Sequence, residues 1–130
     1  MQPNYDEDRE STRYVWNHFQ DRMTEFEKRI GSALFWRERA DLVTDSRVMI
    51  DMLRNKGEIG VVEVDAALSD GHEAYRRKVR DRLLADLEDP IVIHRCGRCR
   101  KVLRTPLARQ CLWCGYDWHG SDESPILETR

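Results

Sequence analysis

The hydrophobic positions between residues 8 and 40 recur at steps of mostly four and three residues, with charged residues between them. This spacing places the apolar side chains on one side of a long helix. Gly31 is the point where we expect this helix to end or bend, because glycine costs about 1 kcal/mol relative to alanine in a helix interior. The predicted apolar stripe consists of Val15, Trp16, Phe19, Met23, Phe26, Ile30, Leu34, Phe35 and Trp36.

A second helix is predicted over residues 47–55, with Val48, Met52 and Leu53 on one face. Thr44 or Asp45 can cap its first turn, because short polar side chains accept hydrogen bonds from the free backbone N–H groups there. The Asn-Lys-Gly sequence at 55–57 predicts its end, since glycine is favoured just past a helix.

Two further helices are predicted before a proline at residue 90. The first covers residues 63–68, although the β-branched content of 58–64 also allows a strand. The second covers residues 72–88, where an apolar residue recurs every four positions, and Asp89-Pro90 ends it. These recurring residues are Tyr75, Val79, Leu83 and Leu87.

Four cysteines follow in the pattern Cys96-x2-Cys99-x11-Cys111-x2-Cys114, and the chain has no others. Two C-x-x-C pairs at this separation bring four thiolates to one point, as a tetrahedral metal ion requires. In a reducing compartment such pairs bind metal more often than they form disulfides. We therefore expect these four cysteines to hold one structural Zn2+ ion.

The segment 91–120 resembles a zinc ribbon, in which a strand, a cysteine knuckle, a hairpin, a second knuckle and a last strand follow one another. Four thiolates leave Zn2+ no open position for water or substrate, so the resemblance implies a structural, non-enzymatic metal. No phosphate-binding loop or other catalytic motif is present in the sequence. The fold class implied is α+β, with a helical domain at 1–90, the ribbon at 91–120 and a flexible tail at 121–130.

Iron is the alternative metal, because the Cys-Gly-Tyr sequence at 114–116 is similar to rubredoxin-type electron-transfer sites and four sulfurs serve either ion. Two features favour zinc: the module is basic, and the first knuckle has Arg100 where the second has a glycine. In the first knuckle the glycine, Gly97, lies inside the turn instead.

Charge is distributed unevenly along the chain. Residues 1–90 carry a net charge of −5, whereas residues 91–120 carry +5. A basic segment beside aromatic residues favours nucleic acid as the partner of the ribbon. Trp113 has two interpretations, stacking on a base or packing with Tyr116 and Trp118 on the apolar side of the ribbon. The contacts predicted in the ribbon are Arg98, Arg100, Lys101, Arg104, Arg109 and Trp113.

Residues 47–95 also resemble a winged helix-turn-helix. This resemblance implies that the helix at 72–88 reads DNA and that its contacts include Arg76, Arg77 and Arg80. The alternative is a solvated helix face whose arginines pair with neighbouring acidic residues. The sequence does not decide between these two interpretations.

A protein–protein adaptor or a homo-oligomeric scaffold is a further hypothesis, with the zinc site serving only as a structural staple. The aromatic stripe of the first helix, including Phe19, Phe26 and Trp36, is long enough to form a homodimer seam. No apolar run reaches the length of a membrane span, and no secretory signal is visible. We therefore expect a cytoplasmic protein without membrane contact.

Overall fold

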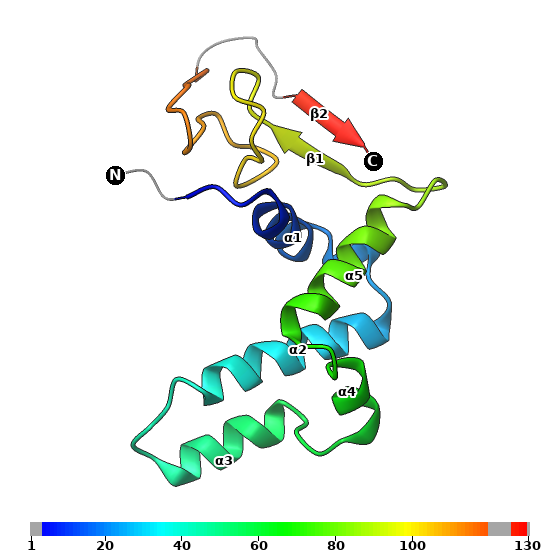
Figure 1. The fold of residues 1–130 in the computed structure, drawn as a ribbon, viewed down its shortest axis with the longest axis vertical. Helices are drawn as coiled ribbons and strands as arrows, with labels where there is room; N and C mark the ends of the chain where they lie inside the picture. The colour runs from blue at the N-terminus through cyan, green and yellow to red at the C-terminus, as the bar shows by residue number, and fades with distance from the viewer. Residues whose placement is uncertain (1–3, 120–125, 130) are drawn as a thin grey trace. The chain divides into compact units, whose positions relative to one another are not determined.

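The computed structural model describes residues 4–119 and 126–129, and it is a helix-rich mixed fold (Figure 1). None of the helices in this part of the chain has the length and apolar content needed to cross a membrane. The elements in chain order are α1 (Glu7–His18), the 3-10 helix η1 (Gln20–Arg22), α2 (Glu25–Ala40), α3 (Arg47–Lys56), α4 (Val62–Ala67), α5 (His72–Leu84), β1 (Val92–Arg95) and β2 (Ile126–Thr129).

The chain divides into two compact units. One consists of Met1–Arg22 together with Arg77–Arg130, and the other of Met23–Arg76. The first unit therefore joins α1 to the cysteine-rich segment, although the two are far apart in the sequence. The predicted domains at 1–90, 91–120 and 121–130 follow other boundaries, and that division stays a prediction.

The long helix predicted for residues 8–40 is interrupted, and the interruption lies at residues 19–24 instead of at Gly31. Thr24 begins α2 with a capping box: its hydroxyl accepts from the Glu27 N–H at 3.1 Å, and the Glu27 carboxylate accepts from the Thr24 N–H at 2.9 Å. These two bonds satisfy backbone groups that a continuous helix would use otherwise. Gly31 lies inside α2.

In the unit Met23–Arg76, α3 returns beside α2. The structure shows one of its two predicted ends to be right and the other wrong. Its N-cap is Ser46, whose hydroxyl accepts from the Met49 N–H at 3.2 Å, so the predicted caps Thr44 and Asp45 were wrong. Gly57 ends the helix as predicted. A Cβ atom at Gly57 would lie 2.6 Å from the Arg37 Cγ atom, so close packing against α2 requires this glycine.

Arg37 ties α2 to the turn that follows α3. Its guanidinium donates to the carbonyl oxygens of Gly57 at 2.6 Å and Glu58 at 3.0 Å, and to the Asp65 carboxylate at 2.8 Å. The segment that allowed either a strand or a helix contains α4, whose Val64 is fully buried. The helical interpretation is thus confirmed.

Helix α5 ends at Leu84, four residues before the predicted end at residue 88. The Asp86 carboxylate accepts from the N–H groups of Glu88 and Asp89, which closes a turn in place of another helical turn. Leu87 consequently lies outside the helix and is 89% exposed, so its predicted place among the recurring apolar residues of the helix at 72–88 was wrong.

The strand expected at the start of the segment 91–120 is present as β1, which pairs antiparallel with β2, with Val92 opposite Thr129 and Arg95 opposite Ile126 (Figure 1). Residues 126–129 of the predicted flexible tail therefore form a strand. Residues 121–125 and 130 of that tail lie outside the described residues.

Candidate metal centre

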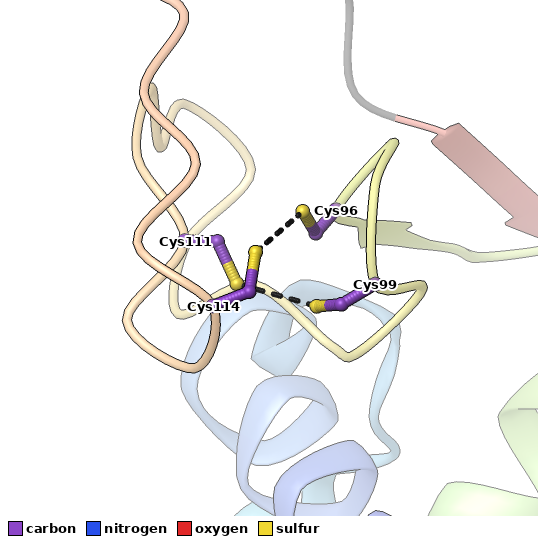
Figure 2. Close-up of side chains that lie close together, drawn as sticks. All are labelled: Cys96, Cys99, Cys111 and Cys114. Atoms are coloured by element: carbon purple, nitrogen blue, oxygen red, sulfur yellow. Dashed lines mark hydrogen bonds between the residues drawn. The ribbon is translucent and has the colours of Figure 1, made fainter. Parts of the chain in front are cut away.

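The four cysteine sulfurs converge on one point in the first unit (Figure 2). All four Sγ atoms lie within 4.8 Å of one another, and the Cys96–Cys114 and Cys99–Cys111 pairs are 3.7 and 3.6 Å apart. Four sulfurs around a tetrahedral zinc ion with Zn–S distances of about 2.3 Å lie about 3.8 Å apart. The cluster can therefore hold a metal ion, and no other residue type among the described residues joins it.

The two knuckles are built as a structural repeat with an offset of 15 residues. Within the first, the Cys96 N–H donates to the Lys101 carbonyl at 3.0 Å, and the Leu103 N–H to the His94 carbonyl at 3.0 Å. In the second, the corresponding bonds join Cys111 to Tyr116 at 2.8 Å and Trp118 to Arg109 at 2.9 Å. The aligned segments, 94–103 and 109–118, share little beyond their cysteines.

Backbone N–H groups point at one sulfur in each knuckle. Arg98 donates to the Cys96 sulfur, and Trp113 to the Cys111 sulfur, both at 3.4 Å. The residue after the second cysteine has a positive φ in both knuckles, 67° at Arg100 and 79° at Gly115. Gly97 lies inside the first turn and does not have a positive φ, so the left-handed position of the first knuckle is occupied by Arg100.

The thiols differ in acidity. Burial raises the pKa of Cys99 to about 12. Cys114 is exposed. Its slight burial acts to raise its pKa, but hydrogen bonds with the Tyr116 backbone N–H and the neighbouring cysteines outweigh this and lower the pKa to about 7. A metal ion binds thiolates, so loading this cluster displaces protons and the apparent affinity rises with pH.

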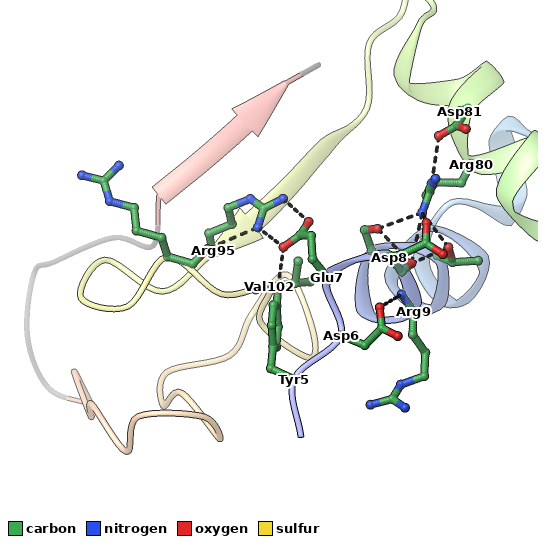
Figure 3. A network of polar contacts seen from close by, with 12 residues as sticks. Tyr5, Asp6, Glu7, Asp8, Arg9, Arg80, Asp81, Arg95 and Val102 are labelled. Carbon is green, nitrogen blue, oxygen red and sulfur yellow. Dashed lines mark hydrogen bonds and ion pairs between the residues drawn. The ribbon is translucent and has the colours of Figure 1, made fainter. Parts of the chain in front are cut away.

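The N-terminal segment before α1 contacts the cysteine module, which is the segment 94–118 that contains both knuckles. The Tyr5 ring meets Trp113 edge to face, with centroids 4.9 Å apart. Its hydroxyl accepts from the Val102 N–H at 3.1 Å and donates to the Glu7 carboxylate (Figure 3). Glu7 also accepts from the Arg95 guanidinium at 2.7 and 2.8 Å.

A small apolar core lies beside the sulfurs. It contains Cys96, Leu103, Cys111, Trp113 and Trp118, and Tyr5 and Tyr116 pack against it. Trp113 is only 8% exposed, so its side chain serves packing, and its predicted contact with nucleic acid is not available in this structure. Neither Tyr5 nor Glu7 belongs to a motif that would have marked it in the sequence.

The arginines predicted to make α5 a DNA-reading helix are engaged in ion pairs. Arg76 pairs with Glu38 at 2.7 Å and Arg77 with Asp8 at 3.2 Å. Arg80 is 8% exposed and donates to Asp8 and to the Thr12 hydroxyl at 2.9 Å (Figure 3). The predicted DNA contacts of these three residues stay predictions. The alternative of a solvated helix face does not describe Arg80, which is buried, and the acidic partners Glu38 and Asp8 lie on other helices.

The basic residues of the cysteine module have different surroundings. Four of them are exposed: Arg98, Arg100, Arg104 and Arg109. None of these four forms an ion pair with a described residue; Arg98 lies over the Tyr116 ring, with its Cζ atom 4.7 Å from the centroid. Lys101 is half-buried, with its Nζ atom 5.5 Å from the Tyr5 centroid.

The comparisons with known proteins add no relative to this picture. No protein-family model matches the chain, no curated protein is similar to it, and no solved structure matches its fold. The case for a function therefore comes from the four sulfurs and from the charges that surround them.

Proposed function

We propose that this chain is a non-enzymatic zinc protein whose C-terminal zinc ribbon binds nucleic acid. The single observation that carries the proposal is the contrast between two sets of arginines. Arg76, Arg77 and Arg80 of α5 are neutralised by Glu38 and Asp8, whereas four arginines of the cysteine module are exposed without an acidic partner among the described residues. Exposed, unneutralised cations are what a phosphate backbone requires.

The proposed metal is one Zn2+ ion in a closed shell of four thiolates. Such a centre carries a formal charge of −2, which reduces the +5 of residues 91–120 without cancelling it. The ion would also supply folding energy that a core of this size cannot. A closed shell offers no coordination site for chemistry, which supports a binding role.

Metal analysis of protein purified under reducing conditions tests the first half of the proposal. We expect one zinc per chain and a colourless solution. Iron at the same stoichiometry, with a red oxidised form, would support the rubredoxin-like alternative. That alternative gains from the positive φ of Arg100, because the first knuckle adopts the conformation of the second without a glycine. Absence of any stoichiometric metal would contradict both.

A titration of labelled DNA and RNA at several salt concentrations tests the second half. Four phosphate contacts predict that log K falls against log salt with a slope of about −3. The double variant Arg104→Gln/Arg109→Gln should reduce the steepness of this slope by about half. The matched control is Arg47→Gln/Arg54→Gln, which removes two exposed charges from α3 and should leave binding unchanged. Equal losses in both variants, or no binding, would contradict a nucleic-acid interface on the ribbon.

A second candidate function, a homo-oligomeric scaffold, is favoured by a separate observation on α3. Leu53 is buried, whereas Val48, Met49 and Met52 on the adjoining face are 81%, 43% and 44% exposed. The apolar face of α3 is thus wider than its own unit covers. The predicted seam along one long aromatic helix is interrupted at Thr24, so α3 is the better place for a contact between copies.

Light scattering on the purified chain decides this second candidate. A dimer that Met52→Asp converts to a monomer would support it, with Leu87→Asp as the control because Leu87 is exposed in the other unit. A monomeric wild-type chain at micromolar concentration would contradict it.

A further inference from the structure

The repeated knuckles create two equivalent faces, and one of them already holds an aromatic ring. That face is formed by Trp113 and Lys101, one residue from each knuckle. Trp113 is two positions after Cys111, and Lys101 is five positions after Cys96. Tyr5 lies against both, with ring centroids 4.9 Å apart at Trp113 and the Lys101 Nζ atom 5.5 Å from its centroid. The Val102 N–H completes the contact by donating to the Tyr5 hydroxyl at 3.1 Å.

The 15-residue offset maps this face onto a second one. Arg98 corresponds to Trp113, Tyr116 to Lys101, and Asp117 to Val102. Arg98 and Tyr116 are indeed neighbours, with the guanidinium carbon 4.7 Å from the Tyr116 centroid. The Asp117 backbone N–H, which corresponds to the donor that meets Tyr5, has no acceptor among the described residues.

We propose that this second face, defined by Arg98, Tyr116 and the Asp117 N–H, binds a nucleobase as the first face binds the Tyr5 ring. The inference rests on the proposed nucleic-acid function and makes it narrower: the ligand is single-stranded nucleic acid. Bases in a duplex are stacked and paired inside the helix, so only an unpaired base can present its ring to a stacking side chain.

The chemistry of the face fits a base better than a phosphate. Arg98 is exposed, and its guanidinium is planar, which allows it to stack on a ring as well as to attract an anion. The Asp117 carboxylate accepts from the His119 N–H at 2.8 Å, and interaction with His119 lowers its pKa. A carboxylate at this position repels a phosphate, but a neutral base can lie beside it and accept a hydrogen bond from the backbone.

Fluorescence anisotropy with three labelled oligonucleotides of equal length tests this proposal: a single strand, its duplex, and a single strand in which the central nucleotides are abasic. The abasic strand keeps every phosphate and loses only the rings. We expect zinc-loaded wild-type protein to bind the normal single strand at least five-fold more tightly than the abasic strand. That ratio is the lower end of what stacking of one base contributes.

Two variants locate the effect. Arg98→Lys keeps the charge but loses the planar group, and Tyr116→Leu keeps an apolar contact with Trp118 but loses the ring. Either should bring the affinity for the normal strand down to that for the abasic strand, with the duplex affinity unchanged within two-fold. Arg98 is exposed, so Arg98→Lys gives a result even if Tyr116→Leu fails to fold and loses its metal.

The outcomes separate this inference from the function on which it rests. If wild-type protein binds none of the three oligonucleotides, the proposed function itself fails. If it binds all three equally, or if Arg98→Lys still distinguishes the normal strand from the abasic strand, the ribbon contacts phosphates only and the base-binding face is wrong.

Discussion

Arg100 and Gly115 are held in the left-handed region by the same hydrogen bond. The N–H of each donates to the carbonyl of the first cysteine of its own knuckle, Cys96 at 3.0 Å and Cys111 at 2.9 Å. Glycine adopts this conformation without a steric penalty, whereas a residue with a Cβ atom pays about 1–2 kcal/mol. The first knuckle therefore contains strain that the second does not.

Substitutions at these positions should change stability in opposite directions. We expect Arg100→Gly to stabilise the metal-loaded protein by about 1 kcal/mol and Gly115→Ala to destabilise it by about the same amount. A Cβ atom at Gly115 meets no atom within 4 Å, so its conformation alone accounts for the cost. Urea unfolding followed by tryptophan fluorescence measures both changes.

Gly97→Ala is the matched control for this pair. Gly97 lies in the first knuckle, has no positive φ, and also has open space where a Cβ atom would be. A change of more than about 0.5 kcal/mol for Gly97→Ala would show that the knuckles respond to any added side chain, and the argument from φ would fail.

The metal site shows which parts of a site are readable from sequence. The spacing of the cysteines was sufficient to bring four sulfurs together, because two C-x-x-C turns have few ways to face each other. The positive φ after the second cysteine could be predicted at Gly115, because glycine favours it. At Arg100 the hydrogen bond to the Cys96 carbonyl imposes the same conformation, and nothing in the sequence marks it. Tyr5 was not readable at all, because its contact joins residues 97 positions apart.

Tyr5→Phe should destabilise the unit that contains the metal site by about 1–2 kcal/mol. The substitution leaves the ring on Trp113 but removes the hydroxyl that joins the Val102 N–H to the Glu7 carboxylate, and the Val102 donor then loses its partner. Chemical denaturation of the zinc-loaded protein at neutral pH provides the measurement. Identical stability of the two proteins would mean that this bridge is replaced by water at no cost.

The same hydroxyl gives a prediction at high pH. Burial and the Glu7 carboxylate raise the pKa of Tyr5 from 10.0 to about 12. An unfolded chain therefore loses this proton near pH 10, while the folded chain keeps it, so the contribution of Tyr5 is complete below pH 10 and is lost as the pH rises to about 12. Wild-type stability should fall more steeply than that of Tyr5→Phe across this range, and parallel curves would contradict the raised pKa.

Substitution of Arg80 should cost much more stability than substitution of Arg77, although both residues pair with Asp8. Arg80 is buried and also donates to the Ser11 and Thr12 hydroxyls, so Arg80→Met removes one of the two donors to the Asp8 carboxylate and the Arg80 donor to both hydroxyls. We expect a loss of about 2 kcal/mol for Arg80→Met, because the buried hydroxyls lose a donor while the half-exposed Asp8 stays paired with Arg77. Arg77 is exposed, and Arg77→Met should cost less than about 1 kcal/mol. Thermal unfolding compares the two; a larger effect at Arg77 would contradict the assignment.

Nucleic-acid binding by the same variants separates the two interpretations of α5. If α5 were a DNA-reading helix, Arg77→Met would weaken binding without changing stability. The ion pairs predict a different result. Arg80→Met should lower the stability of the protein, and Arg77→Met should leave its affinity for nucleic acid unchanged. An affinity loss at Arg77 would restore the winged helix-turn-helix hypothesis.

Helix positions were readable from the apolar spacing, but apart from the end of α3 at Gly57 the helix ends were not. The stripe at 8–40 continues through residues 19–24 because apolar residues keep their rhythm across the break, whereas the capping box of Thr24 and Glu27 is a polar signal within it. Gly31 was expected to break the helix on propensity alone, and a cost of about 1 kcal/mol is small beside the burial of Ile30, Ala33 and Leu34.

The N-terminus of α3 provides the last test, because sequence and structure select different residues for one role. Ser46 accepts from the Met49 N–H at 3.2 Å, and Thr44 caps nothing in the structure as described. Ser46→Ala should therefore cost about 1 kcal/mol, and Thr44→Ala almost nothing. Helix content by circular dichroism and a denaturation curve for each variant give the measurement. A loss at Thr44 equal to that at Ser46 would mean that α3 begins two residues earlier in solution and that the sequence-based cap was right.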